Sequence, residues 1–561
     1  MKVVIVGGVA GGATAAARIR RLDEKAEIII LEKTGYISYA NCGLPYYIGD
    51  VIKDKYDLTL QTPQSFKSRF NIDVRVKNEV LSVNTDEKYV VVKDILKEKV
   101  YKEKYDKLVL SPGAKPIIPN ISGVNSSRIV TLKTVEDTFK IKQLIQDNKY
   151  KRITIVGGGF IGIEMLENLV HLGLDVTLVE GSNQLLGQLD SDMASFIHLK
   201  LMGLGVKFVL NTIVTKFEET SNGLNIFVND QIISQADLVL MTIGVMPETD
   251  FIKNTTIQLG IKNSIIVNDK METSVKDVYA VGDAVEVFNF VTNERGLIAL
   301  AGPANKQARI AADNICGLGT KYQGFQGSSI LKFFDWTIAS TGLSEKQIKK
   351  MEISYDKVIL SPNSNASYYP TGNVMTMKVL YNKENLQILG AQIIGSEGVD
   401  KRIDIIATAM RAKLKATNLV DIDLCYAPPY SSAKDPVNIA GYMIENLEKG
   451  LVKQFYLEDI ENLQKQNDVI LLDTRTSFEY QRGHVEEFIN IPVDDLRNRI
   501  KELTLGKKIY VMCQSGLRSY IACRILLQNG FDCYNFAGGY RFYEINRLNQ
   551  ETCKSRFGCG I

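Results

Sequence analysis

Apolar residues at the start of the chain follow a pattern that predicts a strand, a helix and a second strand. Residues 2–7 are rich in valine and isoleucine with little alternation, as expected for a strand buried on both faces. Gly7-Gly8-Val9-Ala10-Gly11-Gly12 then opens a helix through Arg21, and a second strand, Glu27–Leu31, ends at Glu32. The chain therefore begins with a predicted βαβ unit.

A second region repeats this pattern. The strand Ile153–Val156 leads into Gly157-Gly158-Gly159-Phe160-Ile161-Gly162, and a helix and a strand, Asp175–Val179, follow and end at Glu180. This is a complete GxGxxG fingerprint, whereas the first region has Val9 at the middle glycine. One such motif alone could be a glycine-rich turn, but two with an acidic residue about 20 positions later predict two dinucleotide sites.

Composition narrows the class of protein. A length of 561 residues predicts about three to five domains, and 45% hydrophobic with 23% charged residues is typical of globular chains. The net charge of +3 is spread over mixed acidic and basic residues, so nucleic acid is not an expected partner. No apolar run reaches membrane-helix length, the short N-terminal run is expected to be a strand rather than a signal peptide, and the 8 cysteines form no disulfide framework. We therefore expect a cytoplasmic protein without a membrane partner.

Three further segments carry a family resemblance over about the first 450 residues. These are Ser111-Pro-Gly-Ala114, Thr242-Ile-Gly-Val245 and Asp277-Val-Tyr-Ala-Val-Gly-Asp283. With the two βαβ units they resemble the FAD-dependent pyridine nucleotide–disulfide oxidoreductases. The resemblance implies FAD at the first site and NAD(P)H at the second. It also implies that Asp283 holds the flavin's ribityl chain and that the N-terminus of the following helix faces its phosphate.

The resemblance assigns residues to both cofactors. For FAD they are Gly7, Gly8, Ala10, Gly11, Gly12, Glu32, Lys33, Asp283 and Ala304. For NAD(P)H they are Gly157, Gly159, Phe160, Ile161, Gly162, Glu164, Glu180 and Gly244. A carboxylate at Glu180 can bond a ribose 2′-OH and would repel a 2′-phosphate, which favours NADH. This branch includes users of either nicotinamide, so the choice stays open.

Cys42 is the candidate redox residue. The segment Ser38-Tyr-Ala-Asn-Cys42 has no second cysteine before Cys316, so an internal disulfide is not expected. A lone cysteine is often a small buried hydrophobe, but this one follows the first βαβ unit and opens a helical pattern, where a helix dipole and a flavin could favour the thiolate.

The Cys42 segment resembles the single-cysteine branch of the family: coenzyme A disulfide reductases, NADH oxidases and NADH peroxidases. The oxidases and peroxidases place a histidine in the first glycine loop, where this chain has Ala10; its histidines are His171, His198 and His484. We therefore expect coenzyme A chemistry, with an NADH oxidase or peroxidase using a Cys42 sulfenic acid as the alternative.

Basic residues on the first helix agree with an anionic substrate. Arg18 and Arg21 lie at i, i+3 and could meet a nucleotide near Cys42, although a solvated basic face is an equally simple explanation. Resemblance to coenzyme A disulfide reductases implies a coenzyme A groove lined by Thr14, Arg18, Arg21, Ser38, Asn41, Asn305 and Lys434.

Residues 324–447 are expected to form an α+β dimerisation domain, which in the family lends residues to the partner's active site. Tyr368-Tyr369-Pro370 and Tyr426-Ala-Pro-Pro-Tyr430 place tyrosines beside prolines, usually for packing. A phenol can also donate a proton to a leaving thiolate. By resemblance we assign that role to Tyr368 and Tyr426, and the acting tyrosine in each cluster stays open by one position.

The C-terminal region shows a separate α/β pattern around Cys513-Gln-Ser-Gly-Leu-Arg518-Ser. Four residues between cysteine and arginine give a tight loop whose N–H groups, with a helix dipole, can stabilise a thiolate or persulfide. Together with Asp473-Thr-Arg475, Gly483-His484, Asn490-Ile-Pro492 and Gly538-Gly539-Tyr540 this resembles a rhodanese domain. We expect catalysis by Cys513 and Arg518, with a binding module that lacks activity as the alternative. Gln514 is uncharged, which disfavours a small dianion such as thiosulfate as the sulfur donor.

The expected fold is α/β, with two Rossmann-like domains for FAD and NAD(P)H, an α+β dimerisation domain and a rhodanese-like α/β domain. The expected boundaries are 1–112 with 248–323 for FAD, 113–247 for NAD(P)H, 324–447 for dimerisation, 448–455 as linker, 456–551 for rhodanese and 552–561 as tail. We expect no metal and assign no function to Cys553 and Cys559.

These elements predict a homodimeric NAD(P)H oxidoreductase that reduces coenzyme A-linked S–S bonds. Electrons would pass from NAD(P)H through FAD to a Cys42–S–CoA mixed disulfide, while the rhodanese domain carries sulfane sulfur as a Cys513 persulfide. Coenzyme A persulfide, polysulfide and coenzyme A disulfide remain candidate substrates. Whether sulfur passes directly between Cys513 and Cys42 stays open.

Overall fold

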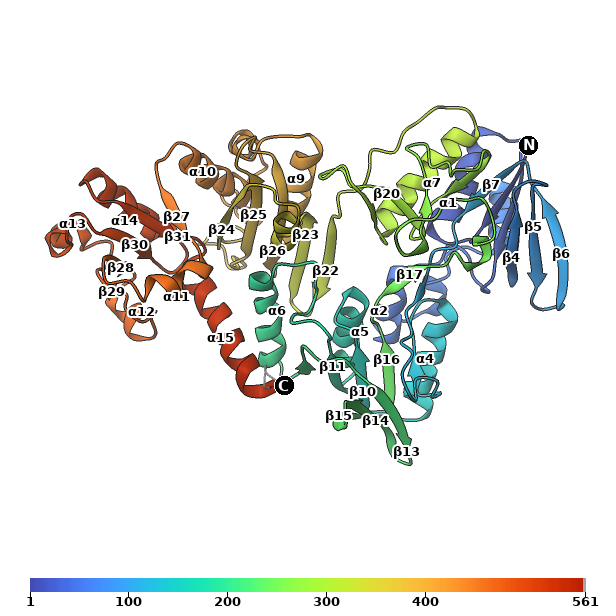
Figure 1. The fold of residues 1–561 in the computed structure, drawn as a ribbon, viewed down its shortest axis with the longest axis horizontal. Coiled ribbons are helices and arrows are strands. Elements are labelled where there is room, and N and C mark those ends of the chain that lie inside the picture. The colour runs from blue at the N-terminus through green and yellow to red at the C-terminus, as the bar shows by residue number, and fades with distance from the viewer. Residues whose placement is uncertain (558–561) are drawn as a thin grey trace. The chain divides into compact units, whose positions relative to one another are not determined.

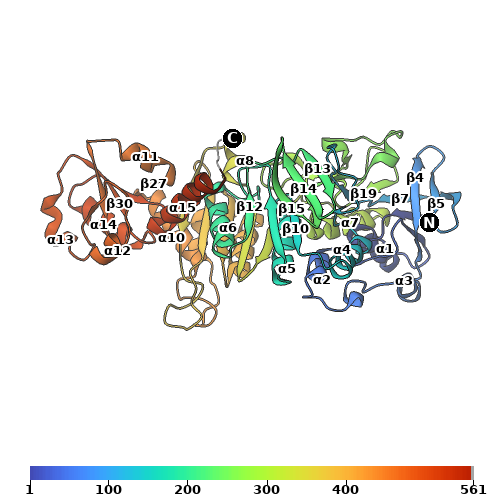
Figure 2. The ribbon, with the colours of Figure 1, turned by 90° about the horizontal axis from the view of Figure 1, so that it is seen from below.

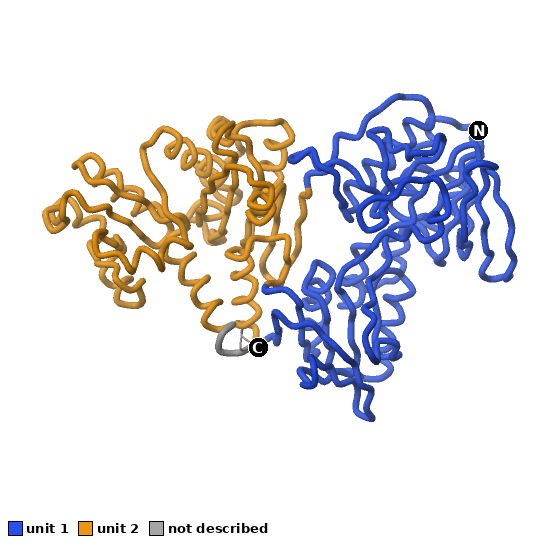
Figure 3. Tube along the Cα trace, viewed as in Figure 1, with its two compact units in different colours: residues 1–183, 206–326 blue, residues 184–205, 327–561 orange. Residues whose placement is uncertain are grey.

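The computed structural model describes the backbone of residues 1–557 and the side chains of residues 1–552, so the side chains of Cys553 and Cys559 lie outside the described residues. Two compact units form: residues 1–183 with 206–326, and residues 184–205 with 327–561 (Figure 3). Within the described part, no helix has the length and apolar character needed to cross a membrane. The α/β fold class is confirmed.

The first unit is built around two parallel sheets of five strands. The first sheet has the order β19-β7-β1-β2-β3. Its strands are β1 (Lys2–Val6), β2 (Glu27–Glu32), β3 (Asp73–Val76), β7 (Lys107–Leu110) and β19 (Val278–Ala280). The apolar runs of β1 and β2 are buried almost throughout, as the predicted two-faced burial requires.

Helices α1 (Ala10–Leu22) and α7 (Ala301–Ile315) pack closely against each other beside this sheet (Figure 1). Their buried faces consist largely of alanine and glycine, which lets the two backbones approach. Thr14 and Arg18 of α1 bond Asn305 and Asp313 of α7 along the same contact, at 2.6 and 2.8 Å.

The second parallel sheet has the order β12-β11-β10-β16-β9. Its strands are β9 (Ile129–Val130), β10 (Arg152–Val156), β11 (Asp175–Val179), β12 (Lys207–Val209) and β16 (Leu238–Met241). Two antiparallel sheets of three strands also belong to this unit. They are β4 (Asn78–Asn84), β5 (Tyr89–Asp94) and β6 (Lys99–Lys104), and β13 (Lys216–Thr220), β14 (Gly223–Val228) and β15 (Gln231–Ala236). Helices α4 (Val135–Asp147) and α5 (Phe160–His171) both contact the short helix α2 (Leu44–Ile48).

The second unit contains an antiparallel sheet and a parallel sheet. The antiparallel strands are β22 (Ser329–Phe333), β23 (Trp336–Gly342), β26 (Ile388–Gly395), β25 (Thr376–Asn382) and β24 (Tyr355–Leu360), in spatial order. Helices α9 (Val399–Arg411) and α10 (Pro436–Glu448) pack against them. The parallel strands are β27 (Lys453–Phe455), β31 (Cys533–Phe536), β30 (Lys508–Met512), β28 (Val469–Asp473) and β29 (Ile489–Asn490).

Helix α6 (Ser191–Gly203) lies between β11 and β12 in sequence but packs in the second unit. It runs beside the C-terminal helix α15 (Gly539–Phe557) in both views (Figures 1 and 2). Ser195 and His198 of α6 lie 2.9 and 3.1 Å from Asn546 and Asn549 of α15. Sequence-based boundaries that keep residues 113–247 together did not anticipate this packing.

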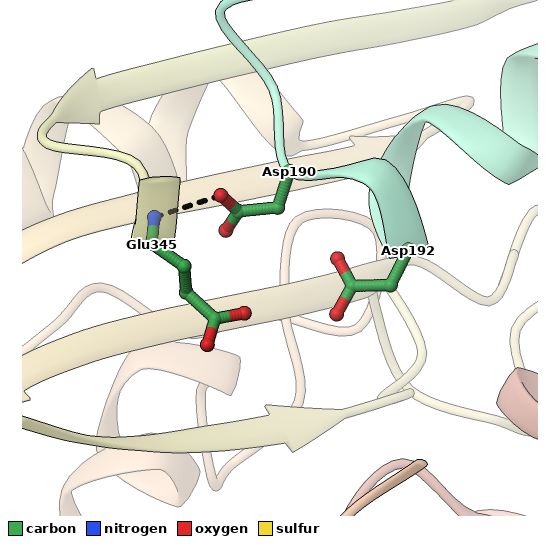
Figure 4. Close-up of side chains that lie close together, drawn as sticks. All are labelled: Asp190, Asp192 and Glu345. Carbon is green, nitrogen blue, oxygen red and sulfur yellow. Dashed lines mark hydrogen bonds between the residues drawn. The ribbon is translucent and has the colours of Figure 1, made fainter. Parts of the chain in front are cut away.

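A buried lysine ties α6 to the antiparallel sheet. Lys378 Nζ lies 3.0 Å from Asp190, 2.7 Å from Asp192, and also contacts Glu345. Figure 4 shows these three carboxylates converging, with Glu345 N–H donating to Asp190 at 2.8 Å. Burial alone would raise the pKa of Glu345, but the charges of Lys378 and Lys357 hold it at about 2. The ammonium of Lys378 is thus the cation that these acids hold.

Candidate functional site

The first glycine loop is shaped to receive a dinucleotide. Gly7 has φ +90°, and a Cβ there would lie 2.1 Å from Ser111 O. A Cβ at Gly12 would lie 1.8 Å from Gly7 O, so both positions require glycine. Val9, which replaces the fingerprint's middle glycine, directly precedes α1. The departure at Val9 leaves the βαβ geometry in place.

The acidic residue that follows this loop is positioned by it. Glu32 ends β2, and its two carboxylate oxygens accept hydrogen bonds from Gly8 N–H and Thr34 N–H, both at 2.8 Å. A cavity of about 400 Å³ lies beside it, and Gly7, Lys33, Pro112 and Glu248 contribute to its wall. These residues fit the adenosine half of FAD at the carboxyl ends of parallel strands.

The remaining FAD residues meet at the start of α7. A Cβ at Gly282 would lie 3.9 Å from Ala304 Cβ, so the backbone next to Asp283 approaches α7. Gly282 N–H donates to Gln307 Oε1 at 2.8 Å, while Gln307 Nε2 is buried without a protein partner. The first helix after Asp283 is α7, which begins at Ala301, and strand β20 (Val285–Phe288) lies between them in sequence.

The second glycine loop repeats the first at β10 and α5. Gly157 has φ +111°, and a Cβ at Gly162 would lie 2.0 Å from Gly157 O. A Cβ at Gly159 would meet no atom within 4 Å, so the loop is open where a pyrophosphate would approach. Glu180 accepts hydrogen bonds from Gly158 N–H and Ser182 N–H at 2.6 and 2.7 Å. This arrangement fits the ribose of a nicotinamide dinucleotide.

Cys42 lies on a single 3₁₀ turn, Asn41–Gly43, that leads into α2, and the residue is exposed. The turn follows Ser38, whose φ of +43° is unusual for a residue with a side chain and whose N–H donates to Gly8 O at 2.8 Å. The predicted helical start at Cys42 is therefore present, and the turn is tied directly to the first glycine loop.

The surroundings of Cys42 disfavour the thiolate. Partial desolvation raises the pKa of the Cys42 thiol, and the charges of Glu164 and Asp283 raise it further, while Lys133 lowers it. Burial raises the pKa of Glu164 to about 7, with a contribution from Glu167. Among the protein's own groups, desolvation and two carboxylates outweigh one lysine in their effect on the pKa of Cys42.

Six of the seven predicted coenzyme A residues lie in the first unit, and the seventh, Lys434, lies in the second. Thr14, Arg18 and Asn305 lie together along the α1–α7 contact, and Arg18 is paired with Asp313 at 2.8 Å. Arg21 and Asn41 are exposed, and Ser38 lies on the Cys42 segment, all in the first unit. Lys434 is exposed in the second unit, directly before the buried N-cap Asp435 of α10.

Tyr368 and Tyr426 are brought together by the fold of the second unit. Their hydroxyl oxygens lie 3.1 Å apart, although 58 positions separate them in sequence. The residues are 74% and 48% exposed. This hydrogen bond raises the pKa of Tyr426. The pair thus offers a protonated phenol at the surface of the dimerisation domain.

Cys513 lies in a loop between β30 and α14 (Leu517–Gln528), as predicted. The residue is 1% exposed, and its sulfur accepts a hydrogen bond from Gly516 N–H at 3.1 Å and lies 3.2 Å from Ser519 Oγ. Helix α15 supports the loop, because Tyr540 N–H donates to Cys513 O at 2.8 Å. The loop is therefore pre-formed around the sulfur.

Arg475 and Arg518, two arginines of this domain, differ in their surroundings. Arg475 is buried, pairs with Asp473 at 2.7 Å and stacks 3.7 Å from the Tyr540 ring, which is a structural arrangement. Arg518 is partly exposed and pairs with Glu479 through two contacts of 2.7 Å.

Sequence reasoning missed three residues next to the two cysteines. Lys133 lies 3.5 Å from Asp283, and its charge lowers the pKa of Cys42, yet no sequence motif surrounds it. Ser519 directly follows Arg518, and no sequence signal indicates that its hydroxyl lies 3.2 Å from the Cys513 sulfur. Glu479 had a signal only as the third residue of a capping box begun by Thr476.

Comparison with known proteins supports these geometries. Residues 1–308 match the model of the pyridine nucleotide-disulphide oxidoreductases, residues 328–436 their dimerisation domain and residues 457–545 the rhodanese-like domain. The chain is 38% identical over 442 residues to the coenzyme A disulfide reductase of Staphylococcus aureus, covering 79% of this chain and 99% of that protein.

Solved structures extend the similarity to the whole length. The crystal structure of reduced Bacillus anthracis CoADR-RHD has a TM-score of 0.95 and 44% identity, covering 98% of each chain. A NAD-dependent persulfide reductase from A. fulgidus has a TM-score of 0.90 and 33% identity, covering 97% of this chain and 100% of that one. The water-forming NADH oxidase of Lactobacillus brevis reaches 0.77 and 28%, covering 80% and 99%.

Proposed function

This chain belongs to the pyridine nucleotide-disulphide oxidoreductase family, and from that premise we propose that it is an NAD(P)H-dependent reductase of coenzyme A-linked S–S bonds with a sulfurtransferase domain. The proposal includes a homodimer working in the cytoplasm, in keeping with the dimerisation domain. The observation that carries it is Cys42, an exposed thiol tied to the first glycine loop, in a chain that also pre-forms a loop around the sulfur of Cys513.

The proposed reaction is balanced for coenzyme A persulfide. The Cys42 thiolate attacks the coenzyme A sulfur, the donor's S–S bond breaks, hydrosulfide leaves, and a Cys42–S–CoA mixed disulfide remains. Two electrons and one proton then release coenzyme A thiol and restore the thiolate. FAD, when bound at the first site, carries those two electrons from NAD(P)H. Overall, NAD(P)H, a proton and the persulfide give NAD(P)⁺, coenzyme A and hydrogen sulfide.

We assign roles to residues on the geometry described above. Glu180 holds the nicotinamide dinucleotide's ribose and favours NADH over NADPH, while Asp283 and Ala304 face the flavin. Thr14, Arg18, Arg21 and Asn305 contact coenzyme A. Tyr368 and Tyr426, as a hydrogen-bonded pair, donate a proton to the leaving thiolate in the active site that the dimer completes.

The rhodanese domain favours sulfane sulfur over a simple disulfide as the physiological substrate. A Cys513 persulfide can exchange sulfur with coenzyme A, which would supply the persulfide that Cys42 consumes. Coenzyme A disulfide remains a second substrate, because the same attack by Cys42 would release coenzyme A thiol in place of hydrosulfide.

The deciding experiment measures anaerobic consumption of NADH and NADPH with coenzyme A persulfide, coenzyme A disulfide and hydrogen peroxide. It compares the wild type with Cys42→Ser and with Cys316→Ser, a matched control for another free cysteine of the first unit. We expect the fastest turnover with the persulfide, release of hydrogen sulfide, loss in Cys42→Ser and normal rates in Cys316→Ser. Faster Cys42-dependent turnover with peroxide would instead identify an NADH peroxidase.

A further inference from the structure

The charge at the mouth of the Cys513 loop is set by a pair that belongs to two helices. Arg518 lies in the first turn of α14, and Glu479 lies on α12 (Ser477–Gln481). Both outer nitrogens of the guanidinium meet the two carboxylate oxygens at 2.7 Å. Both side chains are about one-third exposed, so the pair lies where solvent and substrate can reach it.

Glu479 is held in this position independently of Arg518. Thr476 N–H and Oγ1 each lie 2.9 Å from Glu479 Oε2, and Glu479 N–H donates back to Thr476 Oγ1 at 3.2 Å. The hydrogen bond from Arg518 is the main cause that lowers the pKa of Glu479 to about 2. The Glu479 carboxylate is therefore ionised at neutral pH and neutralises the charge of Arg518. Its hydrogen bonds with Thr476 hold it in that position.

Between Cys513 and Arg518 the loop itself carries no charged side chain. Gln514, Ser515 and Leu517 are uncharged, and Leu517 is 66% exposed. Phe478, beside Glu479, is 68% exposed, and the Arg482 guanidinium lies 5.7 Å from the centre of its ring. Exposed apolar side chains thus lie beside the Arg518–Glu479 ion pair, with the Arg482 guanidinium stacked near Phe478.

We propose that the Arg518–Glu479 pair makes this domain select organic persulfides, the class of coenzyme A persulfide, whose sulfur end carries at most one negative charge, over the thiosulfate dianion. This rests on the proposed sulfurtransferase role of Cys513. A dianionic donor binds more favourably when an unpaired cation lies near the nucleophile. Here Glu479 pairs with Arg518 and so removes that electrostatic attraction. The sulfur end of coenzyme A is carried by an uncharged arm, which suits the exposed apolar side chains beside the pair.

The transfer step is balanced for both donors. The Cys513 thiolate attacks the outer sulfur of R–S–SH, the donor's S–S bond breaks, and R–S⁻ leaves as Cys513–S–SH forms. With thiosulfate the same attack forms the Cys513 persulfide anion and releases sulfite. Neither step needs an oxidant or reductant, so a single experiment can compare the two donors.

The test is Glu479→Gln, because glutamine keeps the capping box with Thr476 and removes the charge. The matched control is Glu502→Gln, which neutralises the similar Arg499–Glu502 pair of the same domain, with contacts of 2.7 and 2.8 Å. Both variants are made in the full-length flavoprotein carrying Cys42→Ser. Loading of one sulfur onto Cys513 from thiosulfate or coenzyme A persulfide is followed by intact-protein mass, at low and high ionic strength.

In Glu479→Gln the thiosulfate-to-persulfide ratio of loading rates should rise about tenfold, and the rise should shrink at high salt. Glu502→Gln should keep the parent ratio. An unchanged ratio in Glu479→Gln, or a parent that prefers thiosulfate, would overturn the inference while leaving sulfur transfer by Cys513 intact. Loading that persists in Cys513→Ser would instead overturn the underlying sulfurtransferase role.

Discussion

Cys42 and Cys513, the two cysteines proposed to react, lie one in each compact unit and differ in their surroundings. Cys42 is exposed on a short 3₁₀ turn, and its neighbours Glu164 and Asp283 oppose ionisation. Cys513 is buried, and its loop supplies Gly516 N–H at 3.1 Å, with Ser519 Oγ at 3.2 Å. One thiol is accessible and disfavoured as an anion, whereas the other is enclosed by hydrogen-bond donors.

This contrast indicates where each activity is completed. The Cys513 loop provides Gly516 N–H and Ser519 Oγ to stabilise an anion on the sulfur. Formation of a Cys513 persulfide is therefore expected to require only a sulfur donor. Among the described residues of its unit, Lys133 is the group that lowers the pKa of Cys42, and desolvation, Glu164 and Asp283 outweigh it. Formation of the Cys42 thiolate is therefore expected to depend on the bound cofactors and substrate.

The largest expected effect separates the two cysteines directly. Cys42→Ser should lower NAD(P)H-dependent reduction of coenzyme A persulfide by about a thousandfold or more, because the nucleophile is lost. Cys513→Ser should abolish sulfur loading yet retain reduction of supplied coenzyme A persulfide. Steady-state rates and protein mass measure the two activities, and a joint loss of both in either variant would contradict two independent centres.

The next effect concerns the stability of the unit that holds Cys513. Lys378→Met should destabilise that unit by about 3–5 kcal/mol, because three carboxylates would lose their buried cation. Denaturant unfolding followed by fluorescence of Trp336, the chain's single tryptophan and a residue of β23, measures this. The exposed Lys346 beside the cluster provides the control Lys346→Met, and equal stability of the two variants would refute the buried pairing.

A smaller effect tests why Cys42 is disfavoured as a thiolate. Glu164 has a pKa of about 7 and is ionised above that pH, where its charge opposes thiolate formation at Cys42. Because the pKa of Cys42 is raised, its alkylation should accelerate only at alkaline pH. Glu164→Gln should move that profile to lower pH and raise the rate at pH 8 about two- to fivefold. Cys513 in the same sample is the reference, and an unmoved Cys42 profile would exclude the carboxylate as a cause.

The smallest effect probes the enclosed thiol. Ser519→Ala removes a polar group 3.2 Å from the Cys513 sulfur and should slow persulfide loading about fivefold. Cys42-dependent reduction, measured in the same preparation, should keep its wild-type rate. If loading proceeds at the wild-type rate, the hydroxyl does not stabilise the sulfur anion.

Local pattern was sufficient for much of this molecule. The valine- and isoleucine-rich strands, the glycine loops and the acidic residues Glu32 and Glu180 were predictable, because a Rossmann unit needs them at fixed short spacing. The cysteine loop from Cys513 to Arg518 was predictable for the same reason. Fold class, family and cofactors all followed from such segments, and the comparisons confirm them.

Contacts between distant segments were decided only by the tertiary structure. The sequence carries no local signal that α6 leaves its neighbours to pack on α15, that Lys378 gathers Asp190, Asp192 and Glu345, or that Glu479 neutralises Arg518. It also could not reveal that desolvation and Glu164 disfavour the Cys42 thiolate. A motif specifies backbone shape over a few residues, whereas burial and charge pairing depend on which remote side chains the fold brings within a few ångströms.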